Sequence, residues 1–237
     1  MRIKIPEMAT GDFGPVEERE AEWQALASPG TEVTVKLAGQ KGPETVESIY
    51  DVAMSTPWLL EEIRKAEGEG FDAVIIPCMA DPGLHAAREI SNIPVIGESE
   101  ISCLLATALG HKFSVLQPIK QSIGVARQNL RSYGLDGSLA SVRTIDVDVN
   151  EMVADPEAMK QATIREGRKA IDEDGADVLV VGCGLMAAIV DALQDELGVP
   201  VIHPYAASIK YAEMLVAMGL SHSKKAYMTP PKKKIQV

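Results

Sequence analysis

Two cysteines occupy matching positions in an internal repeat of the sequence. Residues 70–78 read GFDAVIIPC, and residues 175–183 read GADVLVVGC in the same register. Each of these cysteines, Cys78 and Cys183, follows a short apolar run that predicts a buried strand, and each precedes a segment with helical spacing. Ligands of open α/β sheets bind at the carboxyl ends of the strands. If the two halves pack about an approximate twofold axis, the two thiols approach one cleft from opposite sides.

Two opposed thiols predict the inversion of a carbon stereocentre by proton transfer. Inversion needs a base on one face of the carbon and an acid on the other, with a planar carbanion or enolate between them. The ordinary cysteine pKa of about 8.5 leaves the thiol and the thiolate both accessible near neutral pH. Backbone N–H groups of the segments after the cysteines could stabilise the developing negative charge without a metal. These segments contain Met79 and Ala80 in the first half, and Gly184 and Leu185 in the second.

The rest of the sequence predicts an α/β protein made of two βαβ-type halves with parallel sheets. Short β-branched runs alternate with longer segments whose apolar residues recur at helical spacing, such as 56–68 and 156–173. Several of the short runs are almost entirely apolar, as expected for strands that helices cover on both faces. The predicted strands are 3–5, 32–37, 73–76, 95–96, 113–116, 142–147, 178–181 and 201–202.

Composition and charge argue against several classes of partner. The net charge of −11 argues against nucleic acid or an anionic membrane as the main partner, and the basic cluster at 232–234 is assigned no function. No apolar run approaches the roughly 18 residues of a membrane span, and the first residues lack a secretion signal, so we expect a cytoplasmic location. Three cysteines without CxxC spacing and four histidines without ligand spacing predict neither a disulfide framework nor a metal site.

Three residues near the predicted cleft have simpler structural interpretations. Cys103 lies in an apolar helical stretch and has no counterpart in the other half, so we expect it in the core. Asp81 precedes Pro82, a combination typical of a helix start, and we favour a cap of that helix over a role in the chemistry. His203 follows a predicted strand at the cleft, but a hydrogen-bonded structural role is favoured.

Three motifs together resemble the hydantoin racemase branch of the aspartate/glutamate racemase superfamily, and the likeness runs over most of the chain. Residues 42–48, GPETVES, are similar to the family's Gly-Pro-x-Ser-Ile-Glu segment. Residues 77–84, PCMADPGL, resemble its Cys-x-x-Asp-Pro-Gly-Leu motif. Residues 182–186, GCGLM, resemble its second cysteine motif, Gly-Cys-Ala-Gly-Met.

The resemblance implies two flavodoxin-like, or Rossmann-like, lobes related by a pseudo-twofold axis, with the substrate in the cleft between them. The expected first lobe contains residues 1–98 and 206–237 and carries Cys78, and the second contains residues 99–205 and carries Cys183. Members of this family act on small molecules without pyridoxal phosphate or a metal, and they commonly form homo-oligomers. The resemblance therefore implies a cofactor-independent racemase or epimerase in which the two cysteines are the acid and the base.

The sequence departs from the family pattern at positions that contact the ligand in such proteins. Pro6 and Glu7 stand where members have Pro-Asn, Gln117 begins a site that is usually a pair of threonines, and Leu185 replaces a glycine. A hydantoin, an acidic amino acid or a related molecule with a stereocentre beside a carbonyl therefore remains open as the substrate. Glu7 is consistent with a cationic substrate and equally with a surface or capping role. The predicted substrate-binding residues are Pro6, Glu7, Met79, Ala80, Gln117, Gly184 and Leu185.

Other functions remain open at this point. The same superfamily implies two alternatives, a cis-trans isomerase with a nucleophilic cysteine and a decarboxylase in which a cysteine donates a proton. Two matched cysteines favour racemisation over the decarboxylase, which needs only one, but they do not exclude the isomerase. A third class is a binding protein built from two α/β lobes, and the paired cysteines at strand ends argue against it.

Overall fold

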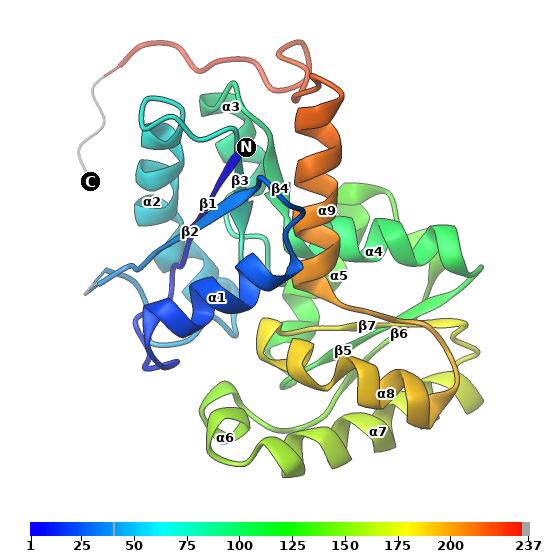
Figure 1. The fold of residues 1–237 in the computed structure, drawn as a ribbon. Helices are drawn as coiled ribbons and strands as arrows, with labels where there is room; N and C mark the ends of the chain where they lie inside the picture. The colour runs from blue at the N-terminus through cyan, green and yellow to red at the C-terminus, as the bar shows by residue number, and fades with distance from the viewer. Residues whose placement is uncertain (40, 234–237) are drawn as a thin grey trace.

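The computed structural model describes residues 1–39 and 41–233 and contains two four-stranded sheets (Figure 1). The strand order is β2-β1-β3-β4 in the first sheet and β6-β5-β7-β8 in the second, so the two sheets share one topology. Every strand pair in the described part of the chain is parallel. The predicted fold class, an α/β protein of two lobes with parallel sheets, is confirmed. Residues 234–237, which include Lys234 of the basic cluster and the end of the expected first lobe, lie outside the described residues.

The strands form where the apolar runs predict them, with one difference. Strand β6 covers Leu139–Thr144, so it begins and ends three residues before the predicted range 142–147. It lies at the edge of its sheet, pairs only with β5, and is only half-buried, so its residues lack a continuous apolar signal. Asp146, with a φ of 54°, turns the chain out of the strand. The other strands are β1 (Arg2–Pro6), β2 (Glu32–Lys36), β3 (Ala73–Ile76), β4 (Val95–Gly97), β5 (Phe113–Gln117), β7 (Val178–Val181) and β8 (Val201–Ile202).

The helices alternate with the strands, as crossover connections of parallel sheets do. Helix α2 starts seven residues before the predicted range 56–68, because Ser48 caps it by accepting the backbone N–H of Asp51 at 3.2 Å, and it then continues through Pro57. The α-helices are α1 (Val16–Leu26), α2 (Ile49–Ala66), α3 (Leu84–Ile90), α4 (Glu98–Leu109), α5 (Ser122–Tyr133), α6 (Val149–Ala154), α7 (Pro156–Asp172), α8 (Val190–Leu197) and α9 (Pro204–Ala217), with 3₁₀ helices η1 (Asp136–Ser138) and η2 (Gly184–Ile189).

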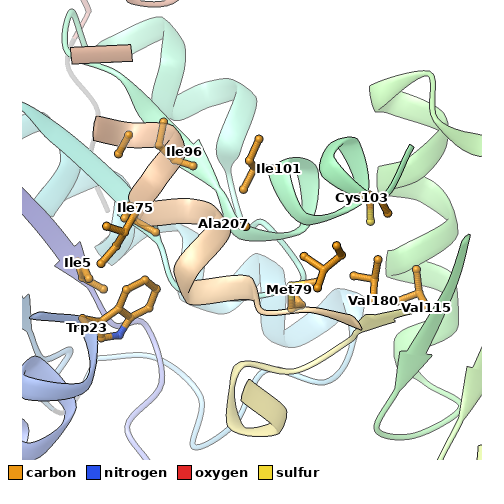
Figure 2. Close-up of a cluster of buried hydrophobic side chains, with 14 of the residues drawn as sticks. Ile5, Trp23, Ile75, Met79, Ile96, Ile101, Cys103, Val115, Val180 and Ala207 are labelled. Carbon is orange, nitrogen blue, oxygen red and sulfur yellow. The ribbon is translucent and has the colours of Figure 1, made fainter. Parts of the chain in front are cut away.

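A single apolar core joins the inner faces of the two sheets. Side chains alternate along each strand, so Ile75 of β3 and Val180 of β7 point to this shared core, whereas Ile76 and Val181 point to separate outer clusters. Figure 2 shows side chains of both sheets in the shared core, with Ala207 of α9 between them. The strand ends of the two sheets are therefore held at fixed positions relative to each other.

Helix α9, orange in Figure 1, packs against α1, α4, β3 and β4. The chain beyond it also contacts the first sheet, because His222 Nε2 lies 2.9 Å from the backbone N–H of Val95 and Lys224 donates to the carbonyl of Ser91. His222 is thus a structural residue rather than part of a free tail. The exact assignment of 1–98 with 206–237 to one lobe, and of 99–205 to the other, stays a prediction. None of the helices in the described residues has the length and apolarity needed to cross a membrane.

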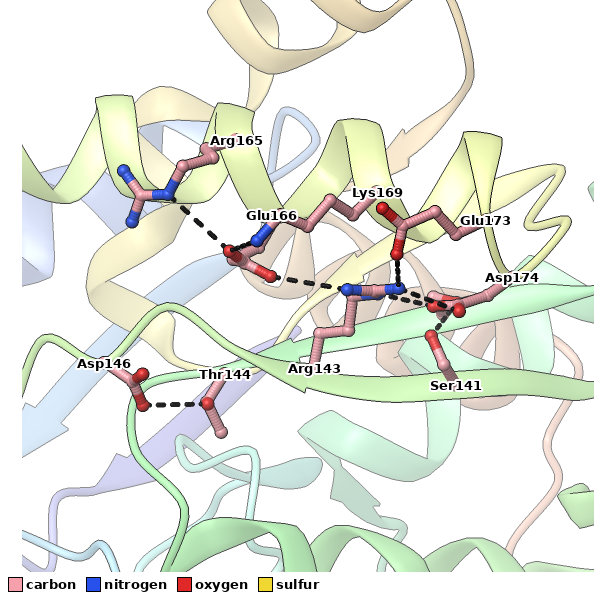
Figure 3. Close-up of polar contacts among 10 residues, drawn as sticks. Ser141, Arg143, Thr144, Asp146, Arg165, Glu166, Lys169, Glu173 and Asp174 are labelled. Carbon is pink, nitrogen blue, oxygen red and sulfur yellow. Dashed lines mark hydrogen bonds and ion pairs between the residues drawn. The ribbon is translucent and has the colours of Figure 1, made fainter.

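Arg143 is the centre of an ion-pair network in the second sheet and its helices. Arg143 of β6 reaches across to α7 and the residues after it, where it contacts Glu166, Glu173 and Asp174 (Figure 3). The Arg143 guanidinium contacts all three carboxylates, so this network links β6 to α7 on the outer face of the sheet.

Candidate active site

The carboxyl ends of β1, β3, β5 and β7 converge on one cavity of about 140 Å³. Equivalent strands of the two sheets thus contribute to opposite parts of the lining, and the remainder comes from helices α1, α5, α6 and α9, from η2, and from the loops before α1 and α2. Its mostly apolar wall with a few polar groups is typical of a small-molecule site. The residues that line it are Glu7, Met8, Ala9, Phe13, Arg19, Trp23, Thr45, Val46, Glu47, Pro77, Cys78, Met79, Ala80, Gln117, Pro118, Ser122, Val125, Ala126, Val149, Gly182, Cys183, Gly184, Leu185 and Tyr205.

Both repeat cysteines line this cavity, and each accepts a backbone N–H from the same relative position in the chain. The backbone N–H of Ala80 donates to the Cys78 sulfur at 3.4 Å. The backbone N–H of Leu185 does the same for Cys183. In each case the donor lies two residues after the cysteine, so the two halves of the repeat fold alike around their thiols.

Burial makes both thiols weak acids. It raises the pKa of Cys183 to about 12 and also raises the pKa of Cys78, while the backbone N–H on each sulfur opposes the shift. Burial thus favours the neutral thiol over the thiolate at both positions near neutral pH. A thiolate formed there is a correspondingly stronger base than an exposed cysteine, which suits the removal of a proton from carbon.

The segments after the two cysteines differ, and Asp81 does not cap its own helix as predicted. Helix α3 begins only at Leu84, and Asp81 has a φ of 46° in the turn before it. The Asp81 carboxylate instead accepts the backbone N–H groups of Ser99 at 3.0 Å and Glu100 at 2.8 Å, so it caps α4. After Cys183 the chain enters η2 directly.

The polar side chains of the cavity come from both lobes. Glu7 forms an ion pair with Arg19 of α1, and burial raises the pKa of Glu7 although Arg19 opposes the shift. On the loop before α2, Glu47 accepts the hydroxyl of Thr45 at 2.7 Å and the backbone N–H of Val149, in the other lobe, at 3.1 Å. Glu47 therefore ties the two sides of the cavity together.

The structure brings most of the predicted site residues together. Pro6 is the exception, because it is buried at the end of β1 and is not among the lining residues. Motif reasoning missed Arg19, Trp23 and Tyr205, which come from helices that carry no motif. The Trp23 and Tyr205 rings stack with centroids 4.0 Å apart. The predicted residues that line the cavity are Glu7, Cys78, Met79, Ala80, Gln117, Cys183, Gly184 and Leu185.

The residues with structural interpretations lie away from the cavity wall. Cys103 is buried in the shared core (Figure 2). His203 is half-buried and caps α9, where its Nδ1 accepts the backbone N–H of Ala206 at 3.4 Å. Within residues 1–39 and 41–233, no three His, Cys, Asp or Glu side chains are grouped as a metal ion requires.

Comparison with known proteins places the chain in a family. The Asp/Glu/hydantoin racemase family model matches residues 16–212. A hydantoin racemase of Pseudomonas sp. (strain NS671) is 41% identical over 200 residues, which cover 84% of this chain and 80% of that protein. Among solved structures, an allantoin racemase from Pseudomonas fluorescens has a TM-score of 0.93 at 34% identity and covers all of both chains. An allantoin racemase from Klebsiella pneumoniae has a TM-score of 0.92 at 33% identity, over 100% of this chain and 96% of that one. The chain therefore belongs to the Asp/Glu/hydantoin racemase family and is an isomerase of the racemase type.

Proposed function

We propose that this protein racemises hydantoins at the ring carbon beside a carbonyl, with Cys78 and Cys183 as the acid and base. The observation that carries the proposal is that two thiols line one cavity, at equivalent strand ends of two sheets with the same topology. The relatives named hydantoin racemase and allantoin racemase support the choice of ring.

In this mechanism one cysteine is a thiolate and the other a thiol when the substrate binds. The thiolate sulfur removes the proton from the stereocentre, and the electron pair of the broken C–H bond moves toward the carbonyl oxygen to give an enolate. The opposite thiol then donates its proton to the other face of the same carbon. Each turnover exchanges the states of Cys78 and Cys183, so the reverse reaction uses the same groups with their roles swapped.

The charges of the cavity favour an uncharged substrate over an acidic amino acid. Arg19 is the one cationic side chain among the described lining residues, and it is already paired with Glu7. Glu47 adds a second carboxylate. A dicarboxylate would meet this negative wall without a free cation, whereas the ring N–H groups of a hydantoin match carboxylate and amide acceptors.

Substrate contacts are proposed for the predicted residues that line the cavity. Glu7 and Gln117 offer polar groups to the ring, and Leu185 narrows the wall beside Cys183. Glu7 held by Arg19 is better placed to accept an N–H than to bind a free cation. Independence from cofactors, a homo-oligomeric state and a cytoplasmic location stay predictions.

The proposal is tested with single enantiomers of 5-substituted hydantoins and of aspartate and glutamate in deuterium oxide. We expect the optical rotation of a hydantoin to decay to zero while its proton NMR signal at the stereocentre disappears, and the amino acids to remain unchanged. Decay with an amino acid alone would refute the substrate class. Carbon dioxide release from a malonate, or a covalent adduct on Cys78 with a cis-alkene substrate, would favour the decarboxylase or the isomerase instead.

A further inference from the structure

The first turn of α4 contains a carboxyl group without a partner. Glu98 is the first residue of this helix, directly after β4, and its exposed fraction is 0%. Neither Oε1 nor Oε2 has a hydrogen-bond partner among the described residues. A buried carboxylate without a donor or a cation is strongly disfavoured, because it loses its hydration without compensation. Glu98 therefore tends to keep its proton in the folded protein.

A carboxyl at a helix N-terminus usually accepts free backbone N–H groups, but here another residue takes them. Asp81 accepts those of Ser99 and Glu100, and it also accepts the hydroxyl of Tyr133 at 2.7 Å. With three donors, Asp81 ionises more readily than Glu98, which has none. Burial, and then the nearby Asp81, raise the pKa of Glu98 well above its ordinary value.

Glu98 follows Gly97, whose partner in the parallel register of β4 and β3 is Ile76, two residues before Cys78, so Glu98 and Cys78 lie after neighbouring strands at the same edge of the first sheet. Glu98 is not a lining residue, yet a charge on it raises the pKa of Cys78, of Cys183 and of Tyr205 on α9. The other ionisable groups that act on the thiols are also acids: Cys183 and Asp81 on Cys78, and Glu47 on Cys183. No cation in the described residues offsets them in these shifts. A negative charge on Glu98 would therefore make a thiolate harder to form.

We propose that Glu98 is a positioning residue that controls the ionisation of the cysteine pair from a buried position outside the cavity lining. This inference rests on the proposed two-cysteine function. Protonated Glu98 leaves one cysteine free to become the thiolate base. Ionised Glu98 opposes the loss of a proton from either thiol, and so preserves a thiol as the donor on the opposite face. Glu98 and the thiols thus compete for negative charge and titrate as a coupled set.

The direct test follows thiol ionisation without any substrate. Cys78 and Cys183 are alkylated with iodoacetamide across the alkaline pH range, and peptide mass spectrometry resolves the two sites. We expect Glu98→Gln, which is neutral at every pH, to lower the pH midpoint of alkylation at both cysteines. Identical midpoints in the variant and the native protein would overturn the proposal.

A matched control changes a buried carboxyl elsewhere. Glu62 of α2 is buried and pairs with Lys4 at 3.0 Å, outside the cavity wall. Glu62→Gln should leave the alkylation midpoints at their native values. An equal shift in this variant would show that the effect of Glu98→Gln is a general consequence of altered packing, and would also overturn the proposal.

A second readout is the pH dependence of racemisation. In the native enzyme kcat/KM should rise with pH and level off once Glu98 ionises, whereas in Glu98→Gln it should keep rising, by about tenfold for each pKa unit that Glu98 adds to the thiols. Glu98→Asp keeps an ionisable carboxyl and should restore the levelling. Coincident native and Glu98→Gln profiles would contradict the role.

The alkylation and turnover measurements distinguish a failure of the Glu98 proposal from a failure of the proposed hydantoin racemase function. Shifted alkylation midpoints in a protein that turns over no hydantoin would retain Glu98 and refute the proposed function. If Glu98→Gln does not fold, ¹³C NMR of the native protein labelled at glutamate carboxyl carbons decides. One glutamate should then remain protonated near neutral pH, and the absence of such a signal would overturn the proposal.

Discussion

The two cysteine segments begin alike and then diverge. In both, a buried strand ends, a cysteine follows, and a backbone N–H two residues later reaches the sulfur. After Cys78 the chain makes a turn whose Asp81 caps α4, whereas after Cys183 it enters η2. The repeat thus preserves the geometry of the thiol, while the following residues connect the two segments to different parts of the core.

The difference is clearest at the residue directly after each cysteine. Met79 is 4% exposed and packs in the shared core (Figure 2). Its counterpart is Gly184, where an added Cβ would lie 2.6 Å from the Tyr205 hydroxyl. One side of the cavity therefore presents an apolar side chain and the other a tyrosine hydroxyl. We expect the two enantiomers of a substrate to meet unequal walls even though they meet equivalent thiols.

Removing either thiol should have the largest effect. Cys78→Ser and Cys183→Ser should each reduce racemisation by about 10³-fold or more, because inversion needs both an acid and a base. Each variant should still exchange the proton at the stereocentre of one enantiomer only, as followed by NMR in deuterium oxide. Cys103→Ala is the control and should racemise at the native rate. Full activity in either serine variant would refute equivalent roles for the two thiols.

Gly184→Ala should lower kcat by disturbing only the segment that carries Cys183. The added methyl collides with Tyr205, whose ring cannot swing away without breaking its stack on Trp23. The segment that carries Cys183 must then shift, and a displacement of about 1 Å lowers kcat by about a hundredfold. Gly124→Ala on α5, where an added Cβ meets nothing closer than 3.9 Å, is the matched control and should keep native kinetics. Equal kcat values for the two variants would contradict the claim that the close contact of Gly184 with Tyr205 positions the Cys183 segment.

Asp81→Asn tests the connection made by the first segment. Weaker capping of α4 should lower the free energy of unfolding by about 1 to 2 kcal/mol at acidic pH. Burial raises the pKa of Asp81 to about 7 from its ordinary 3.8, so the native protein loses stability as the pH rises through this window, and the asparagine variant does not. The stability gap between the two proteins should therefore narrow from pH 4 to pH 7 in denaturant titrations. A gap that widens would show that the folded protein prefers Asp81 ionised.

Glu47→Gln should have the smallest effect. It weakens the contact with Val149 that ties the loop before α2 to the second lobe. The loss of about 1 kcal/mol corresponds to a KM about fivefold higher with little change in kcat. Glu44→Gln, an exposed change on the same loop, should leave KM unchanged. A fall in kcat larger than the rise in KM would mean that Glu47 acts on the chemistry rather than on closure of the cavity.

Local patterns of sequence predict the buried strands and the positions of Cys78 and Cys183 at strand ends. Buried strands such as β3 and β7 are apolar at every position, and that signal does not depend on distant contacts. The edge strand β6 lacks it, so its ends were predicted wrongly. Helix α2 begins seven residues before the predicted start, because Ser48 caps it outside the run of helical spacing.

The rest of the site depends on long-range packing that spacing does not encode. Arg19 and Tyr205 reach the cavity from α1 and α9, because those helices lie against the sheets, and no motif marks either residue. The hydrogen-bond partners of Asp81 are the backbone N–H groups of Ser99 and Glu100, which belong to α4 and follow β4 in the chain. In the sequence, Glu98 is a single acid after an apolar strand. Its burial and its lack of a hydrogen-bond partner are visible only in the structure.

In the proposed mechanism, two cysteines on opposite faces exchange protons with one carbon. The most direct measurement converts one hydantoin enantiomer in deuterium oxide and stops the reaction early, so that chiral chromatography and mass spectrometry report deuterium in the product and in the recovered substrate. We expect deuterium at the stereocentre of nearly every product molecule and almost none in the recovered substrate, because the donor thiol carries solvent deuterium and the proton removed stays on the other cysteine. Product that retains the original proton would show that one group acts on both faces, and would refute the two-cysteine mechanism.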